Sequence, residues 1–245
     1  MQGAITLLCL PCAGASATMY LRWRRQLPGW IQVVPVELPG RGTRMGEPFE
    51  EDFGTLVERL CEEQAQALRG SYAIFGHSMG SLLAWGMARR LRSLGRALPR
   101  VLLASGSPAP SQRDPDRFAS RNDDEALTED LRKQGGTPEE VFASAELMSI
   151  TLNVLGADYR VCESFSYPGA DPLPMPLHVF AGREDDIDRA RIEAWAAEAG
   201  HAYSLDWFDG GHFFIRQSEQ AVLKALTRRL ADSVSGGSHA SRAFA

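Results

Sequence analysis

The feature that most constrains the fold of this chain is an alternation of short apolar runs with longer amphipathic segments. Six runs rich in aliphatic and β-branched residues begin near positions 4, 31, 71, 100, 176 and 203. Segments with helical spacing of apolar residues cover 52–69, 81–95, 188–200 and 218–233. Strands that alternate with helices form parallel sheets covered by helices on both faces. We therefore expect an α/β fold with a mostly parallel central sheet.

One interval interrupts this alternation. Residues 107–175 contain polar, proline-containing and helical pieces but no convincing strand, so we expect an inserted helical lid. The chain has 245 residues with 44% hydrophobic content, enough for one good-sized core, and a single domain over 1–233 is expected. Residues 234–245 are mostly small and polar, and we expect a disordered tail there.

Composition excludes several classes of protein. A net charge of −5 argues against nucleic-acid binding, which needs a basic face to neutralise phosphates. No apolar stretch reaches the roughly 18–20 uncharged residues of a membrane helix. The N-terminal run ITLLCLPCAGASA resembles a secretory signal, but no lysine or arginine precedes Arg22. We expect a cytoplasmic protein.

The same N-terminal run contains a Cys-x-x-Cys pair, Cys9 and Cys12. The other cysteines, Cys61 and Cys162, form no second pair, and no His-x-x-x-His accompanies them, so a zinc site lacks two ligands. Four cysteines in so long a chain also argue against a disulfide framework. We expect reduced thiols, no bound metal, and a buried strand that runs into a loop of small residues.

A candidate nucleophile lies in FGHSMGSLLAW, residues 75–85. Here Gly76-His77-Ser78-Met79-Gly80 forms a Gly-x-Ser-x-Gly between an expected strand and an expected helix. On such a sharp strand-to-helix turn the serine Oγ is exposed, and the helix N-terminus directs amides toward developing negative charge. The pattern alone also fits a helix-capping serine. With the strand before it and the helix after it, Ser78 is predicted to be the nucleophile.

An activated serine needs a base, and His212 in WFDGGHFFI follows the last expected strand. The two preceding glycines let the loop turn the imidazole back over the sheet. The other histidines lie within the elbow, within or at the start of strands, or in the tail, where a structural or solvated role fits better. His212 is therefore the predicted base.

The third member of a catalytic triad should be a carboxylate at a strand end between Ser78 and His212. HVFAGREDDIDRA offers four carboxylates there: Glu184, Asp185, Asp186 and Asp188. The order Ser, Asp, His is that of an α/β-hydrolase. The earlier strand end after RVLLASG has no carboxylate until Asp114. Asp185 is preferred, with Asp186 as the main rival and helix capping or surface charge as the alternative role.

Together these motifs resemble the discrete type II thioesterases that accompany polyketide and nonribosomal peptide synthases, within the α/β-hydrolase superfamily. The similarity extends from LPCAGASA to about Ala231. VELPGRGTRMGEP is similar to the family's Pro-Gly-Arg segment. NDDEALTEDLRKQGGTPEEV and LNVLGADYRVCESFSY are similar to its lid helices, and GREDD and GGHFF match its acid and histidine motifs.

The resemblance also implies roles for particular residues. The family pattern Gly-x-x-Asp maps to Gly182 and Asp185. The family's Pro-His-Ala-Gly-Gly loop contributes to the oxyanion hole, and Pro11–Ala15 occupies its place, with Cys12 for histidine and Ala15 for glycine. The backbone amides of Ala13 and Met79 are the implied oxyanion pair. In the lid, Leu-Gly-Ala-Asp at 155–158 replaces the usual Leu-Arg-Ala-Asp.

The resemblance further implies hydrolysis of acyl groups from the phosphopantetheine arm of a carrier protein, with no resident cofactor, by a monomer. Candidate acyl-chamber residues in the lid are Phe142, Leu147, Met148, Ile150, Leu152, Leu155 and Phe165. Arginines that could face an acidic carrier protein are Arg22, Arg24, Arg25, Arg89, Arg90 and Arg92. For each residue, lid packing or a solvated helix face is the ordinary alternative.

Three other functions fit the same motifs. An acyltransferase would pass the acyl group to an acceptor other than water, and a small-molecule esterase would use the same triad on oxygen esters. An inactive scaffold that binds carrier proteins is the third. The late His212 together with Asp185 favours the hydrolase.

Overall fold

The structure is a computed structural model that describes residues 3–118, 123–169 and 171–236. Six strands form one sheet in the order β2-β1-β3-β4-β5-β6, and every neighbouring pair is parallel. Their bounds are β1 Ile5–Leu10, β2 Ile31–Pro35, β3 Tyr72–His77, β4 Leu102–Ser105, β5 Leu177–Gly182 and β6 Tyr203–Phe208. The expected parallel α/β fold is confirmed.

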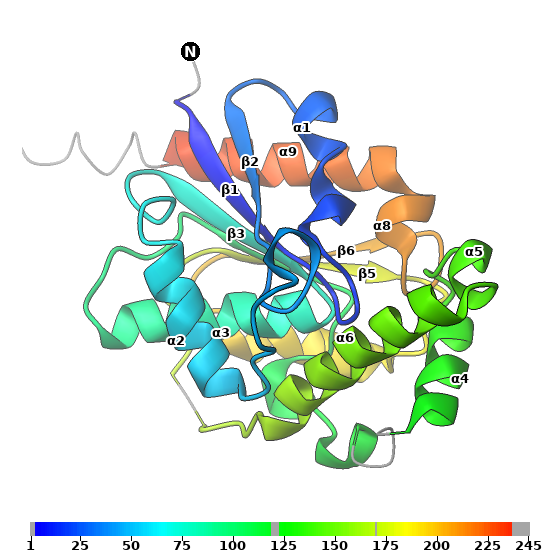
Figure 1. The fold of residues 1–245 in the computed structure, drawn as a ribbon. Coiled ribbons are helices and arrows are strands. Elements are labelled where there is room, and N and C mark those ends of the chain that lie inside the picture. The colour runs from blue at the N-terminus through cyan, green and yellow to red at the C-terminus, as the bar shows by residue number, and fades with distance from the viewer. Residues whose placement is uncertain (1–2, 119–122, 170, 237–245) are drawn as a thin grey trace, which may run out of the picture.

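Helices cover both faces of this sheet (Figure 1). The α-helices are α1 Trp23–Gln26, α2 Phe53–Glu63, α3 Met79–Ser93, α4 Asp124–Gln134, α5 Glu139–Phe142, α6 Ala145–Ser164, α7 Arg189–Glu193, α8 Phe214–Gln217 and α9 Glu219–Gly236. Short 3-10 turns are η1 Ala17–Tyr20, η2 Gly42–Arg44, η3 Pro110–Gln112, η4 Pro115–Arg117 and η5 Ala194–Glu198. No helix among the described residues is long and apolar enough to cross a membrane.

The core consists of two layers, one on each face of the sheet. Successive side chains of a strand point to opposite faces, so Leu7 packs in the layer beneath α9 while Leu8 packs in the layer beneath α2 and α3. Both leucines have no exposed surface. Strands buried on both faces read as continuous apolar runs rather than alternating ones, which explains the sequence ITLLCL of β1.

Between β4 and β5 the chain leaves the sheet and forms η3, η4, α4, α5 and α6. These helices gather at one end of the sheet, beside the carboxyl ends of the strands (Figure 1). The 20-residue α6 begins after Ser144, whose side chain accepts a hydrogen bond from Leu147 N. Leu127 of α4 packs on Leu152 and Leu155 of α6. The segment expected as a lid is therefore helical over these elements.

Some boundaries differ from the sequence-based expectation. The run 31–38 forms a strand only to Pro35, although Val36 N still donates to Cys9 O. The helix expected over 52–69 ends at Glu63, and turns follow it. α9 extends to Gly236, into the segment expected as a tail, while 237–245 lie outside the described residues. The domain limits 1–233 remain a prediction.

Candidate active site

The predicted catalytic residues lie on loops that leave the sheet at neighbouring strand ends. Gly76 pairs with Leu10 in register, and His77 pairs with Ser105, so β1, β3 and β4 end at the same level. Ser78 comes directly after β3, Asp185 after β5 and His212 after β6. In open parallel sheets, ligands bind at the carboxyl ends of the strands. The topology therefore brings these three residues to one edge.

Ser78 has a strained backbone. Its φ of 55° and ψ of −116° make it the one non-glycine residue with positive φ in the described part of the chain. Such a conformation costs about 1–3 kcal/mol and persists where the surroundings enforce it. Here Ser78 N donates to Ser105 O at 2.7 Å, and α3 begins at the next residue. This is the turn predicted from Gly-x-Ser-x-Gly.

The two glycines of the motif are required by close packing. A Cβ on Gly76 would lie 2.0 Å from Gly80 O, and a Cβ on Gly80 would lie 2.3 Å from Leu10 O. The second contact involves the end of β1, so the loop after β1 lies directly against the first turn of α3. This contact brings the predicted oxyanion loop beside Ser78.

His212 and Asp185 form a hydrogen-bonded pair. His212 Nδ1 lies 2.9 Å from Asp185 Oδ2, and the Asp185 side chain has no exposed surface. Among the described residues no direct hydrogen bond joins His212 to Ser78, yet both line one cavity. Bonds of this kind are commonly long before substrate binds. Asp185 thus orients the imidazole beside the Ser78 hydroxyl.

The other candidate carboxylates have different partners. Asp186 forms an ion pair with Lys133 at 3.0 Å, and Asp188 accepts a hydrogen bond from Ala190 N at the start of α7. Glu184 is exposed, and Asp114 caps η4 by accepting from Asp116 N. Of the four carboxylates after β5, Asp185 is the one that contacts His212.

The remaining described histidines lack the position of a base. His77 is fully buried, its Nδ1 lies 3.0 Å from Ser105 Oγ, and burial lowers its pKa well below the usual value. His178 lies within β5, and burial lowers its pKa to about 4. His201 is exposed between η5 and β6. His239 lies outside the described residues.

The loop after β1 lines the same cavity as Ser78. Cys12, Ala13 and Met79 all contribute to its wall. Ala15 N donates to Cys12 O at 3.1 Å, which folds the loop into a tight turn. Cys12 is 4% exposed, and burial raises the pKa of its thiol to about 12. A neutral, buried thiol is a poor nucleophile and a poor metal ligand, so the contribution of Cys12 to the cavity is its shape and apolar surface.

A buried ion pair holds this loop from the far side. Arg41 forms two 2.6 Å bonds to Asp158, and the two side chains are 5% and 1% exposed. Asp158 also accepts from Gly14 N at 2.8 Å, and Arg41 donates to Ala15 O at 3.3 Å. The Pro-Gly-Arg segment and the lid helix α6 are therefore both bonded to the loop that carries Ala13.

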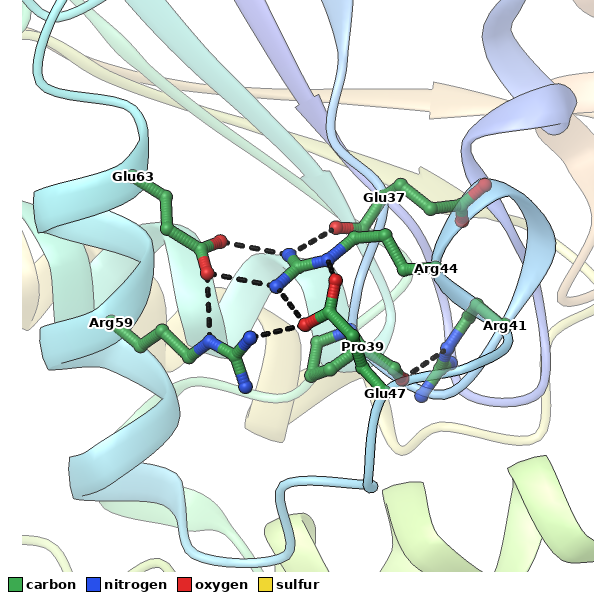
Figure 2. Close-up of polar contacts among 7 residues, drawn as sticks. All are labelled: Glu37, Pro39, Arg41, Arg44, Glu47, Arg59 and Glu63. Atoms are coloured by element: carbon green, nitrogen blue, oxygen red, sulfur yellow. Dashed lines mark hydrogen bonds and ion pairs between the residues drawn. The ribbon is translucent and has the colours of Figure 1, made fainter.

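The segment that presents Arg41 is itself fixed to α2 by a network of charges (Figure 2). Arg44 binds the carboxylates of Glu47 and Glu63, and Arg59 of α2 bonds to the same two groups. Hydrogen bonds from Arg44, more than any other interaction, lower the pKa of Glu47 to about 2. The Arg41 side chain points away from this network (Figure 2) and bonds to Asp158.

The sequence did not indicate the Arg41–Asp158 pair. The two residues are 117 positions apart, and each occurs in a motif with several charged residues. The Leu-Gly-Ala-Asp sequence in α6 departs from the family pattern at position 156 rather than at Asp158. Only the placement of α6 across the strand ends brings the two charges together.

The cavity at Ser78 has a volume of about 40 Å³. Besides residues from the strand ends, its wall includes Phe118, Gln134, Tyr159, Cys162 and Ile187. None of the seven lid residues proposed from the sequence as an acyl chamber lines it. Leu152 and Leu155 pack inside the lid, whereas Leu147 and Ile150 face outward. The helical pattern could not distinguish the side of α6 that faces the lid from the side that faces the cavity.

A larger groove adjoins this cavity and shares Cys12, Ala13 and Gln134 with it. Its volume is about 520 Å³, and it extends between the loop after β1, the lid and α8. Arg22 and Arg216 are the arginines in its wall. The candidate nucleophile therefore lies in a small cavity, and a larger groove adjoins that cavity.

The four cysteines are buried free thiols. Within the described ranges, no three or more histidine, cysteine or acidic side chains are grouped so that they could bind a metal ion.

Comparison with known proteins places this geometry in a family. The family model described as "Thioesterase domain" matches residues 5–232. The gramicidin S biosynthesis protein GrsT of Aneurinibacillus migulanus is 32% identical over 227 residues, which cover 92% of this chain and 89% of that protein.

Solved structures agree with the sequence comparison. RedJ, a thioesterase from the prodiginine pathway of Streptomyces coelicolor, is 33% identical with a TM-score of 0.85, covering 92% of this chain and 90% of that one. BorB, the type II thioesterase of the borrelidin biosynthetic cluster, is 35% identical with a TM-score of 0.84, and the match covers 93% of each chain.

Proposed function

The chain belongs to the thioesterase family as a type II thioesterase with the α/β-hydrolase fold, and from this premise we propose that it hydrolyses acyl groups from the phosphopantetheine arms of carrier proteins. Two of its structural relatives, ClbQ and the type II thioesterase YbtT, come from the colibactin and yersiniabactin NRPS/PKS pathways. In such a pathway, hydrolysis would clear aberrant or stalled acyl units from the synthase. The proposed enzyme works in the cytoplasm as a monomer, without a resident cofactor.

The proposed chemistry has two steps. His212 removes the proton of Ser78, Oγ attacks the thioester carbonyl, and the amides of Ala13 and Met79 stabilise the oxyanion. The thiol leaves with a proton from His212. Water then attacks the acyl-enzyme with His212 as base, and the acid product and free Ser78 result.

The observation that carries this proposal is the Asp185–His212 pair beside a strained Ser78. The buried carboxylate holds the imidazole with Nδ1 protonated, so that Nε2 is available to the serine, and it stabilises the imidazolium that forms. A buried carboxylate and a histidine on neighbouring loops beside a nucleophile elbow form the triad that serves acyl transfer. A thiol has a pKa near 8–9 and leaves more easily than an alkoxide, which suits thioesters.

The two spaces at Ser78 match the two parts of such a substrate. The pantetheine arm is long and polar and ends in a phosphate, which fits the larger groove with Arg22 and Arg216 in its wall. The acyl group then occupies the small cavity lined by Ser78 and His212.

Three measurements separate this function from its alternatives. The kcat/KM for a carrier-bound thioester should exceed that for the matched oxygen ester, and the reverse would indicate a small-molecule esterase. Free acid should be the product even when amine or alcohol acceptors are added, whereas an acyltransferase would yield the acceptor adduct. A fluorophosphonate should label the wild type but not Ser78→Ala. If the protein were an inactive scaffold, neither form would be labelled.

A further inference from the structure

The small cavity beside Ser78 is unusually cationic for a site that receives an acyl group. Arg113, Arg117 and Arg191 all line it together with Ser78 and His212. Among the described residues, Asp114 is the one carboxylate in the wall. Asp185 is bonded to His212 and does not line the cavity. Pockets for acyl chains are expected to be mostly apolar, so three guanidinium groups here need an explanation.

Arg113 is the most informative of the three. It is half-buried, and in the part of the chain that the structure describes it pairs with no carboxylate. Its guanidinium contacts the Cys162 thiol and lies 5.8 Å from the ring centroid of Phe118. Burial, together with the neighbouring positive charges of Arg117 and Arg191, lowers its pKa. A charge taken out of water in this way is costly unless an anion compensates it.

The other two arginines are not fully neutralised either. Arg191 donates from Nε and Nη2 to one backbone carbonyl, Gln112 O. Arg117 lies 5.9 Å from the Phe118 centroid and interacts at longer range with Asp186, which is already bonded to Lys133. Asp114 is exposed and caps η4. Positive charge therefore predominates in the wall.

The size of the cavity limits the group that it accepts. A volume of about 40 Å³ corresponds to roughly three water molecules by the same measure. That is enough for a short acyl group of a few heavy atoms, and the longer arm has its own groove. Building on the proposed function, we propose that this enzyme selects short acyl groups that carry a carboxylate, such as malonyl or succinyl, and rejects acyl groups that carry an ammonium.

The expected selectivity depends on the Arg113 guanidinium, which has lost part of its contact with water and, within the described ranges, lacks an anionic partner. A carboxylate that enters the cavity gives Arg113 the anion that it lacks, and charge-assisted hydrogen bonds to guanidinium are about twice as strong as neutral ones. A neutral alkyl group of the same shape leaves the guanidinium unpaired. An ammonium adds a fourth positive charge to a site of low dielectric.

The test uses three thioesters of N-acetylcysteamine with acyl groups of nearly the same shape and different charge: malonyl, isovaleryl and 3-aminobutyryl. Each kcat/KM is divided by the hydroxide-catalysed rate of the same thioester, which removes differences in intrinsic reactivity. In the wild type, malonyl should exceed isovaleryl at least tenfold, and isovaleryl should exceed 3-aminobutyryl at least tenfold.

Variants then assign the preference to the arginines. Arg113→Met should reduce the malonyl-to-isovaleryl ratio at least tenfold, and Arg117→Gln should reduce it in the same direction. Arg189→Gln is the matched control, because Arg189 is on α7 near Arg191, pairs with Glu193 and does not line the cavity. Its ratio should equal that of the wild type.

The outcomes distinguish this inference from the proposed function. Equal or faster hydrolysis of isovaleryl than of malonyl by the wild type would overturn the inference while leaving thioester hydrolysis intact. A ratio that survives in both Arg113→Met and Arg117→Gln would overturn it as well. If the wild type hydrolyses none of the thioesters, the proposed function itself fails and the inference fails with it.

Discussion

At the scale of single residues, the site depends on groups that hold other groups in place. Ser78 keeps an unfavourable backbone conformation because glycines at 76 and 80 allow close packing around it. Asp185 acts through His212, and Asp158 acts through Gly14 N, which directly follows Ala13 in the loop after β1. Rate enhancement from oxyanion amides requires that they be fixed before the reaction. In the proposed mechanism, Asp158 is therefore a positioning residue.

A double-variant series tests this positioning. Asp158→Leu should destabilise the fold by about 3–5 kcal/mol, because it leaves Arg41 buried without a partner. Arg41→Met combined with Asp158→Leu should recover much of that stability in urea unfolding, since no charge is then stranded. The double variant should still have a kcat lowered roughly tenfold or more with KM nearly unchanged, because Gly14 N has lost its acceptor.

An exposed ion pair on the same helix provides the control for this test. Arg160→Gln on the same helix breaks the exposed pair with Glu51 and should change stability by less than about 1 kcal/mol. If the double variant recovers stability together with the wild-type kcat, the pair has a structural role alone.

At the scale of elements, the sequence predicted most of what has a repeating pattern. Apolar runs in the sequence predict strands β1, β3, β4, β5 and β6. Amphipathic spacing predicts the helix after Ser78. Boundaries were less accurate where tertiary contacts decide them, as at Glu63, where α2 ends. The lid was expected as helices, but which side of α6 faces the cavity depends on contacts between α6 and distant loops.

The positions of the surface arginines indicate where a carrier protein should bind. Arg89 is ten residues beyond Met79 on α3, about 15 Å along the helix, and donates to Asp171 O. Arg90 pairs with Glu58. Arg22 lines the groove that adjoins the cavity at Ser78; its side chain is 78% exposed and lies 3.6 Å from Glu219. We therefore propose Arg22, whose side chain extends from the groove into solvent, as the arginine that contacts an acidic carrier protein.

Charge reversal at these sites separates the two possibilities. Arg22→Glu should raise KM for an acyl-carrier protein several-fold at low salt and leave KM for an N-acetylcysteamine thioester unchanged, because only the carrier extends to the surface. Arg89→Glu should change neither value. An effect of Arg89→Glu on the carrier substrate that Arg22→Glu lacks would place docking at α3.

At the scale of the whole molecule, buried histidines link stability to pH. Burial lowers the pKa of His178 to about 4, and that of His77 also lies below the ordinary value near 6.5. The unfolded chain therefore binds protons that the folded chain does not as the pH falls below about 6.5. Stability should decrease over that window and level off for His178 near its folded pKa.

Urea unfolding at a series of pH values measures this effect. His178→Gln should remove part of the slope of unfolding free energy between pH 6.5 and pH 4, up to about 3 kcal/mol over the interval. The exposed His201 provides the control, and His201→Gln should leave the slope unchanged. A slope that is identical in all three proteins would show that His178 keeps its ordinary pKa when folded.

The whole fold also explains which site residues were predictable. Ser78, His212 and Asp185 follow strands, and parallel strands bring their ends together, so sequence order and spacing sufficed to propose them. Arg41, Asp158 and Arg113 are not in motifs that state a role by themselves. Their partners come from the inserted lid or the loops around it, and the pattern of one sequence does not reveal such pairings.

The proposed mechanism requires that Ser78 form an acyl-enzyme and that water hydrolyse it. The most direct measurement is hydrolysis of a panel of acyl-phosphopantetheinyl carrier proteins, with intact-protein mass spectrometry of the enzyme at early times. We predict release of free acid from at least one member, a transient mass increase equal to the acyl group, and loss of both in Ser78→Ala. Hydrolysis by Ser78→Ala at the wild-type rate, or no hydrolysis of any member, would contradict the account.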